Sequence, residues 1–208
     1  MSTSAQLTFV TSSRPEIKSQ QTNKSIDYFP YLNNQFLMIA ASLNGGNVLQ
    51  YLITTIKKVN QQFADVTVSE SKIWDKIIEL GMQFLNHEND QNKKDKTLKI
   101  KPILFGERHQ PDVLGSIDNI SLNVDFGELI VSFCEGLIDN IFEMMSVELM
   151  VKSGIETLIG TGSALIKNAI LQKILDQKLN DKIQVIFTDG NDAHIGVAML
   201  VNEHFNKI

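Results

Sequence analysis

The segment ETLIGTGSALIKNAILQKIL, residues 156–175, decides the fold of this chain. Leu158 and Ile159 indicate the end of a short buried strand, and the small residues 160–163 indicate a turn after it. One apolar face of the helix that follows is formed by Ile170, Leu171, Ile174 and Leu175. A strand that runs through a glycine turn into a helix N-terminus lets an anionic ligand approach backbone N–H groups at the positive end of the helix dipole. The segment therefore predicts either a nucleotide-binding turn or a turn with a purely structural role.

Two familiar phosphate-binding motifs can be compared with this segment. A P-loop needs glycine, four residues and then Gly-Lys-Ser/Thr, and no such run occurs in the chain. A dinucleotide-binding fingerprint needs a third glycine where Leu165 stands, and Asp189 would serve as its acidic residue after the next strand. Because that glycine is missing, a dinucleotide-binding half-domain is kept only as a rival interpretation.

Composition limits the class of protein and its partners. The 208 residues are 43% hydrophobic, which suits one large or two small soluble domains. The net charge is −5 and no basic run is longer than the pair Lys93 and Lys94, so we expect no nucleic-acid partner. The single cysteine, Cys134, lies in an apolar helical stripe and predicts a buried thiol in a reducing compartment. With no signal peptide and no apolar run longer than 36–41, we expect a cytoplasmic protein without a membrane partner.

The rest of the chain indicates mixed strands followed by alternating helices and strands. Strands are expected at 7–10, twice within 28–41, at 98–105 and at 183–187. Helices are expected at 48–63, 71–85 and 126–151, and a last one after Asp192, which would be its N-cap. This order predicts one α/β layer structure with helices on a mixed sheet. Small-residue turns at 2–4, 44–47 and 160–163 would form a nucleotide cleft if they meet at one sheet edge.

Three other residues have both a structural and a functional interpretation. Glu107 and Arg108, beside a glycine turn, predict a fixed ion pair, with a ligand clamp as the alternative. Trp74 lies on an apolar helix face and is expected to be a core anchor rather than a stacking platform.

Four segments together resemble a known family. They are YFPYLNNQFLMIAASLNGGNVL (28–49), PILFGERHQPD (102–112), IGTGSALIKNAIL (159–171) and DGNDAHIGVAML (189–200). In this order they resemble the FGGY carbohydrate kinases through nearly the whole chain, and within that family they are most similar to a kinase of a seven-carbon ketose. The resemblance implies an ATP-dependent phosphotransferase that acts on a sugar with Mg²⁺.

The resemblance also implies a fold and a domain. It implies a ribonuclease-H-like lobe of the actin and hexokinase ATPase type, with a mixed central sheet flanked by helices. Residues 1–208 would be the C-terminal nucleotide-binding lobe, without the N-terminal lobe. Eight residues would bind the nucleotide. They are Thr3 and Ser4 near the phosphates, Gly46 and Gln50 beside the nucleotide, and Gly160, Gly162, Ser163 and Asn168 around the adenosine.

What the resemblance leaves unassigned is the catalytic base and any metal ligand. In the family, the aspartate that acts as general base belongs to the first lobe, with most sugar contacts. Asp112, Asp189 and Asp192 stand in turns and are not assigned that role here. We therefore expect this chain to bind ATP or ADP weakly, to meet sugar only with the N-terminal lobe, and to be nearly inactive alone. The alternative is a truncated, non-catalytic subunit or regulatory fragment that associates with a kinase lobe.

Overall fold

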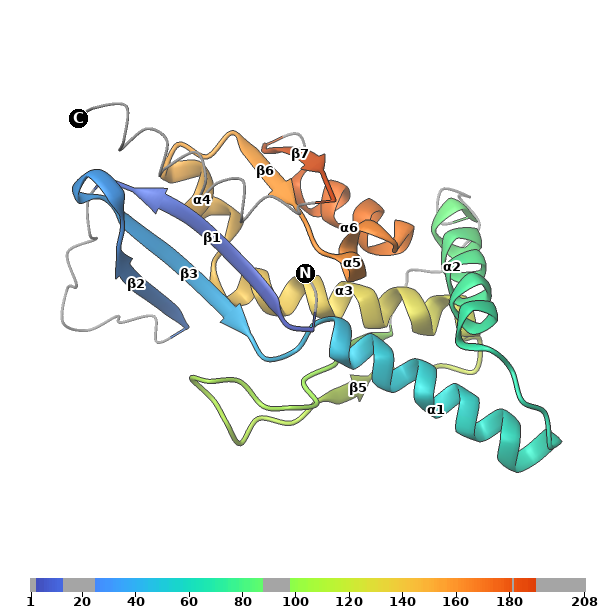
Figure 1. The fold of residues 1–208 in the computed structure, drawn as a ribbon. Helices are drawn as coiled ribbons and strands as arrows, with labels where there is room; N and C mark the ends of the chain where they lie inside the picture. The colour runs from blue at the N-terminus through green and yellow to red at the C-terminus, as the bar shows by residue number, and fades with distance from the viewer. Residues whose placement is uncertain (1–2, 13–24, 88–97, 181, 190–208) are drawn as a thin grey trace, which may run out of the picture.

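A computed structural model describes residues 3–12, 25–87, 98–180 and 182–189 of the chain (Figure 1). Three antiparallel strands, β1 (Ala5–Thr11), β2 (Ile26–Pro30) and β3 (Phe36–Ser42), form a sheet in the order β1-β3-β2. A short 3₁₀ helix, Leu32–Asn34, connects β2 to β3. Every second residue of β1 is buried, as a strand with one face on the core requires. The strands predicted at the start of the chain and within 28–41 are confirmed.

The remaining described strands form two separate pairs. Strands β6 (Thr157–Gly160) and β7 (Gln184–Phe187) are parallel, whereas β4 (Lys99–Lys101) and β5 (Ser116–Asp118) are antiparallel. The sequence predicted one mixed sheet, but among the described residues no hydrogen-bonded ladder joins β1 to β6. The strand predicted at 98–105 is shorter because Pro102 follows β4 and has no N–H to continue its ladder.

Six helices are described, and most follow the predicted periodicity. They are α1 (Gly46–Ala64), α2 (Glu70–His87), α3 (Phe126–Met144), α4 (Val147–Lys152), α5 (Ser163–Ile166) and α6 (Ala169–Leu179). The single helix predicted at 126–151 is wrong in one respect, because Met145 has extended backbone angles. Ser146 then starts α4, and its Oγ accepts a hydrogen bond from Leu149 N at 3.2 Å.

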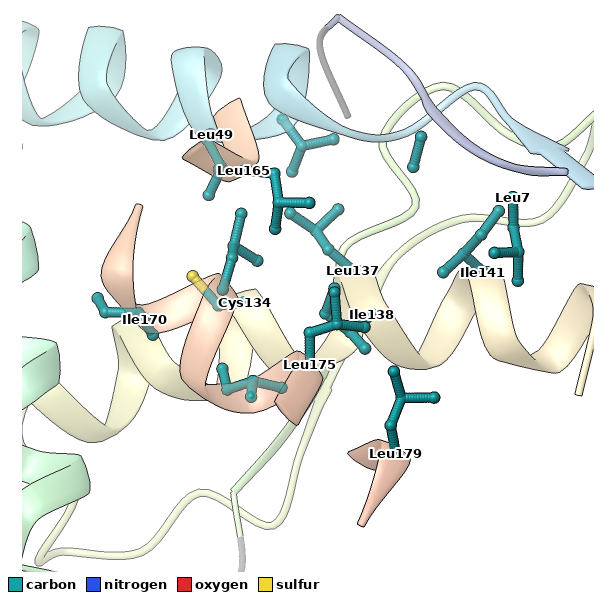
Figure 2. Close-up of a cluster of buried hydrophobic side chains, with 14 of the residues drawn as sticks. Leu7, Leu49, Cys134, Leu137, Ile138, Ile141, Leu165, Ile170, Leu175 and Leu179 are labelled. Carbon is teal, nitrogen blue, oxygen red and sulfur yellow. The ribbon is translucent and has the colours of Figure 1, made fainter. Parts of the chain in front are cut away.

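Helix α3 lies at the centre of the fold. It contacts β1 and β3 on one side, and α2, α6 and β4 on others. Figure 2 shows side chains of this core, where Leu137, Ile138 and Ile141 of α3 lie near Leu165 from α5, Leu175 from α6 and Leu7 from β1, respectively. Cys134 is fully buried in the same cluster, so the prediction of a buried thiol is confirmed.

Two sequence predictions concern other parts of the chain. The helix expected after Asp192 and most of the segment 189–200 lie outside the described residues. Among the residues that are described, no helix combines the length and the apolar character that crossing a membrane requires.

Candidate functional site

One candidate site is a cavity of about 750 Å³ bordered by α1, α2 and the start of α6, here called the α1–α2 cavity. Five residues predicted from the sequence line it: Thr3, Gly46, Gln50, Ser163 and Asn168. Its volume lies within the range of about 300–1,000 Å³ that small-molecule sites occupy. The structure thus brings most of the predicted set to one place.

The other three predicted residues line a neighbouring cavity. Ser4, Gly160 and Gly162 border a space of about 410 Å³ between β1 and β6. The two cavities adjoin, because Thr3 is followed by Ser4 and Gly162 by Ser163 along the chain. The eight predicted residues therefore divide over two adjacent cavities.

Close backbone contact holds the first two small-residue turns together. Asn47 N donates a hydrogen bond to Thr3 O at 3.0 Å. A Cβ atom at Gly45 would lie only 2.6 Å from the Ser4 carbonyl carbon and 2.7 Å from Ala5 N, so only glycine fits there. The third turn reaches the same cavity through Ser163, and Gly162 takes a φ of 93° to make that turn. One residue or more of each of the three turns thus lines the α1–α2 cavity.

The N-terminus of α1 gives the cavity a positive partial charge. Its N-cap residue, Gly45, has no side chain to accept hydrogen bonds, and Asn47 Oδ1 accepts from Gly45 N at 2.8 Å and from Val48 N at 2.9 Å instead. Gly46, the first residue of this 19-residue helix, lines the cavity without a Cβ. Backbone approach and the helix dipole together favour an anionic ligand at this end.

Asn168 combines a helix cap with a polar atom that has no partner. Its Oδ1 accepts hydrogen bonds from Ile170 N at 3.0 Å and Leu171 N at 3.2 Å, which caps α6. Its Nδ2 is buried, and among the described residues it has no hydrogen-bond partner. A buried unpaired donor is costly, by about 1–3 kcal/mol. Asn168 is also one of the residues that line the α1–α2 cavity.

One wall of the cavity was missed by the sequence interpretation. Ser71, Trp74, Asp75 and Ile78 of α2 all line the cavity. Trp74 packs against the core as predicted, and because it is only half-buried it also lines the cavity. The spacing of these residues, i, i+3, i+4 and i+7, marks one face of a helix and could have revealed this wall.

The predicted ion pair between Glu107 and Arg108 is wrong. Glu107 is 2% exposed and accepts hydrogen bonds from neutral groups, whereas Arg108 is exposed. Neighbouring side chains of a turn point in different directions, and here one enters the core while the next faces solvent. Among the described ion pairs, none includes Glu107.

Known proteins similar to this chain include kinases of sugars and a kinase of glycerol. No protein-family model matches the chain. Human sedoheptulokinase is 32% identical over 186 residues, which cover 88% of this chain and 36% of that protein. Among solved structures, a ligand-bound xylulose kinase from Lactobacillus acidophilus aligns with a TM-score of 0.66 and 18% identity over 96% of this chain and 36% of that one. Glycerol kinase from Plasmodium falciparum, solved with ADP, aligns with a TM-score of 0.61 and 14% identity over 96% of this chain and 36% of that one.

The similarity to solved structures defines the class of fold. It confirms the predicted α/β lobe of the actin and hexokinase ATPase type. The sequence likeness is more specific, and the chain is similar to part of an FGGY carbohydrate kinase. It spans about a third of the length of the curated relatives that it matches.

Proposed function

We propose that residues 1–208 form the C-terminal, nucleotide-binding lobe of a sedoheptulokinase-like enzyme. The complete enzyme would transfer the γ-phosphate of MgATP to sedoheptulose and form sedoheptulose 7-phosphate in the cytoplasm. The observation that carries this proposal is the meeting of three turns and five predicted residues at the α1–α2 cavity. The likeness to human sedoheptulokinase supports the choice of sugar.

Each wall of the cavity has a chemical role in this proposal. The N-terminus of α1 at Gly46, with Thr3 and Ser4 beside it, would face the phosphates, because backbone N–H groups and hydroxyls donate hydrogen bonds to anions. The indole of Trp74 would lie against the adenine ring, and Asn168 Nδ2 would donate to an acceptor of the nucleoside. We expect Mg²⁺ to enter with the nucleotide, since this ion is usually held by phosphates, water and one or two carboxylates.

The chain supplies only one side of the proposed reaction. Phosphoryl transfer depends on aligning the acceptor oxygen with the γ-phosphate and on stabilising the charge that develops. The turn residues Asp112 and Asp189 are exposed and line neither the α1–α2 cavity nor the cavity between β1 and β6. We therefore expect no residue of this chain to orient the sugar, and negligible turnover by the chain alone.

Calorimetry with MgADP, beside a coupled ADP-release assay with sedoheptulose, tests this function. We expect MgADP to bind with a Kd near the millimolar range, about −4 kcal/mol, and NAD to bind no better. We expect no ADP release above the background without sugar. Appreciable turnover by this chain would refute the view that it lacks the acceptor side, and a clear preference for NAD would favour the dinucleotide-binding rival.

A second candidate function is that of a non-catalytic subunit that associates with a kinase lobe. The observation in its favour is a segment with several exposed apolar side chains between β4 and α3: Leu114 is 78% exposed, Ile120 70% and Leu122 105%. Exposed apolar surface on this scale is typical of protein contacts. Co-purification with the first lobe of a related kinase would support this role, and a monomer that captures no such lobe would count against it.

A further inference from the structure

A carboxyl group is buried next to the α1–α2 cavity without lining it. Glu107 is 2% exposed, and its Oε1 accepts hydrogen bonds from Ser42 Oγ at 2.6 Å, Asn44 Nδ2 at 2.8 Å and Asn140 Nδ2 at 2.7 Å. Its Oε2 accepts from Leu43 N at 3.0 Å. We call Ser42, Asn44, Glu107 and Asn140 the carboxyl cluster. Backbone and amide N–H groups can only donate, so the arrangement suits a carboxylate, which only accepts.

The carboxyl cluster ties together three parts of the chain that are distant in sequence. Asn44 has a fixed orientation, because its Oδ1 accepts from Leu104 N at 2.9 Å and Phe105 N at 3.2 Å, while its Nδ2 also donates to Gly106 O at 2.9 Å. Asn140 adds helix α3, and it donates to Ser42 Oγ at 3.0 Å as well. The end of β3 is thus held against both the Gly106 turn and the central helix.

The residues that follow Asn44 form the phosphate-facing wall of the proposed site. Gly45 caps α1 and lies against Ser4, Gly46 lines the α1–α2 cavity, and Asn47 N donates to Thr3 O. A displacement of Asn44 would move Gly45 and Gly46, and through the contact at Gly45 it would also move Thr3 and Ser4. Because the fit at Gly45 leaves no room, such a displacement cannot be absorbed locally.

We propose that Glu107 is a positioning residue for the nucleotide: through the carboxyl cluster it sets the position of the α1 N-terminus and of the 3–4 turn, and so controls the affinity for a nucleoside di- or triphosphate. This inference rests on the proposed function. Glu107 does not line the α1–α2 cavity and would not contact the ligand itself. A purely structural role predicts instead that its loss lowers stability and leaves the affinity of each folded molecule unchanged.

The test is the variant Glu107→Gln in the full chain, with its affinity for MgADP measured by calorimetry. Glutamine keeps the shape of glutamate, but its amide NH₂ must face a donor whichever way it turns, because both oxygens of Glu107 receive N–H groups. We expect a Kd for MgADP about tenfold higher, with a stoichiometry that stays near one per folded molecule. A Kd equal to that of the wild type would overturn the inference, whatever happens to the unfolding temperature.

Two further variants separate this inference from instability and from failure of the proposed function. Ile26→Val, on the β2 edge of the sheet, lowers stability without touching the cluster and should leave the Kd unchanged. Ser42→Ala removes one hydrogen bond to Glu107 and serves if Glu107→Gln does not fold. It should raise the Kd about threefold and speed hydrogen exchange at the Asn47 amide. An unchanged Kd or an unchanged exchange rate would overturn the inference. If the wild-type chain itself binds no MgADP, the proposed function fails, and in that case the inference falls with it.

Discussion

Gly45→Ala tests the contact between the 3–4 turn and the N-terminus of α1. The added methyl group would lie 2.6 Å from the Ser4 carbonyl carbon, 2.7 Å from Ala5 N and 2.9 Å from Ser4 Cα, and all three are backbone atoms. An ordinary contact begins at 3.4 Å, so the two turns must separate by about 0.8 Å. Overpacking of this kind costs about 1–3 kcal/mol of folding free energy.

The same separation should weaken nucleotide binding, because Thr3, Ser4 and Gly46 would no longer hold their relative positions. We expect the Kd for MgADP to rise about tenfold or more, which corresponds to about 1.4 kcal/mol. The assay is calorimetry at a temperature where thermal denaturation shows that the variant is folded.

Gly154→Ala is the matched control for this prediction. Gly154 has a φ of 78°, and a Cβ there would have no neighbour within 4 Å. Alanine should therefore cost about 1–2 kcal/mol through backbone strain alone and leave MgADP binding unchanged. If Gly45→Ala binds MgADP as tightly as Gly154→Ala does, the reasoning that links this turn to the nucleotide is refuted.

Three other predictions concern the adenosine side of the site and the core. Asn168→Asp keeps the oxygen that caps α6 but loses the Nδ2 donor. The unfolding temperature should therefore change little, while the Kd for MgADP should rise about tenfold. Asn168→Ala also removes the cap, so this variant should in addition lose about 0.5–2 kcal/mol of stability. Equal nucleotide affinity in the wild type and Asn168→Asp would exclude the donor role. Gly136→Ala places a Cβ 2.0 Å from Ile100 O, and we expect a loss of about 1–3 kcal/mol in urea denaturation, so an unchanged midpoint would contradict the packing of β4 on α3. Cys134 is 0% exposed and should react with a thiol reagent only after unfolding, and rapid reaction of the native protein would contradict the buried core.

Local patterns were sufficient for the elements that nucleotide binding would use. Helices α1 and α2 appeared as apolar residues at helical spacing, and the glycine turn before α5 appeared as a run of small residues after a strand. Thr3, Gly46 and Ser163, which line the α1–α2 cavity, were predicted as site residues from the resemblance to the kinase family. Spacing alone could not have shown that these turns meet.

Tertiary contacts decided the features that sequence reasoning missed. Glu107 and Arg108 are adjacent and opposite in charge, which made an ion pair the natural interpretation. The actual partners of Glu107 are 65 residues before it, at Ser42, and 33 residues after it, at Asn140, and no local pattern points to them. The end of α3 was missed for a smaller reason: Met145 is apolar and continues the helical stripe, although its backbone is extended and Ser146 starts a new helix.

Photolabelling with 8-azido-ADP is the measurement that tests the nucleotide site most directly. The full chain would be irradiated with the probe and Mg²⁺, digested, and the modified peptides identified by mass spectrometry, with excess ADP as competitor. We predict labelling in the α2 segment that contains Trp74 or in the segment from Ser163 to Asn168, and suppression of that labelling by ADP. Labelling confined to other parts of the chain, or labelling that ADP does not suppress, would contradict the assignment of the α1–α2 cavity as the nucleotide site.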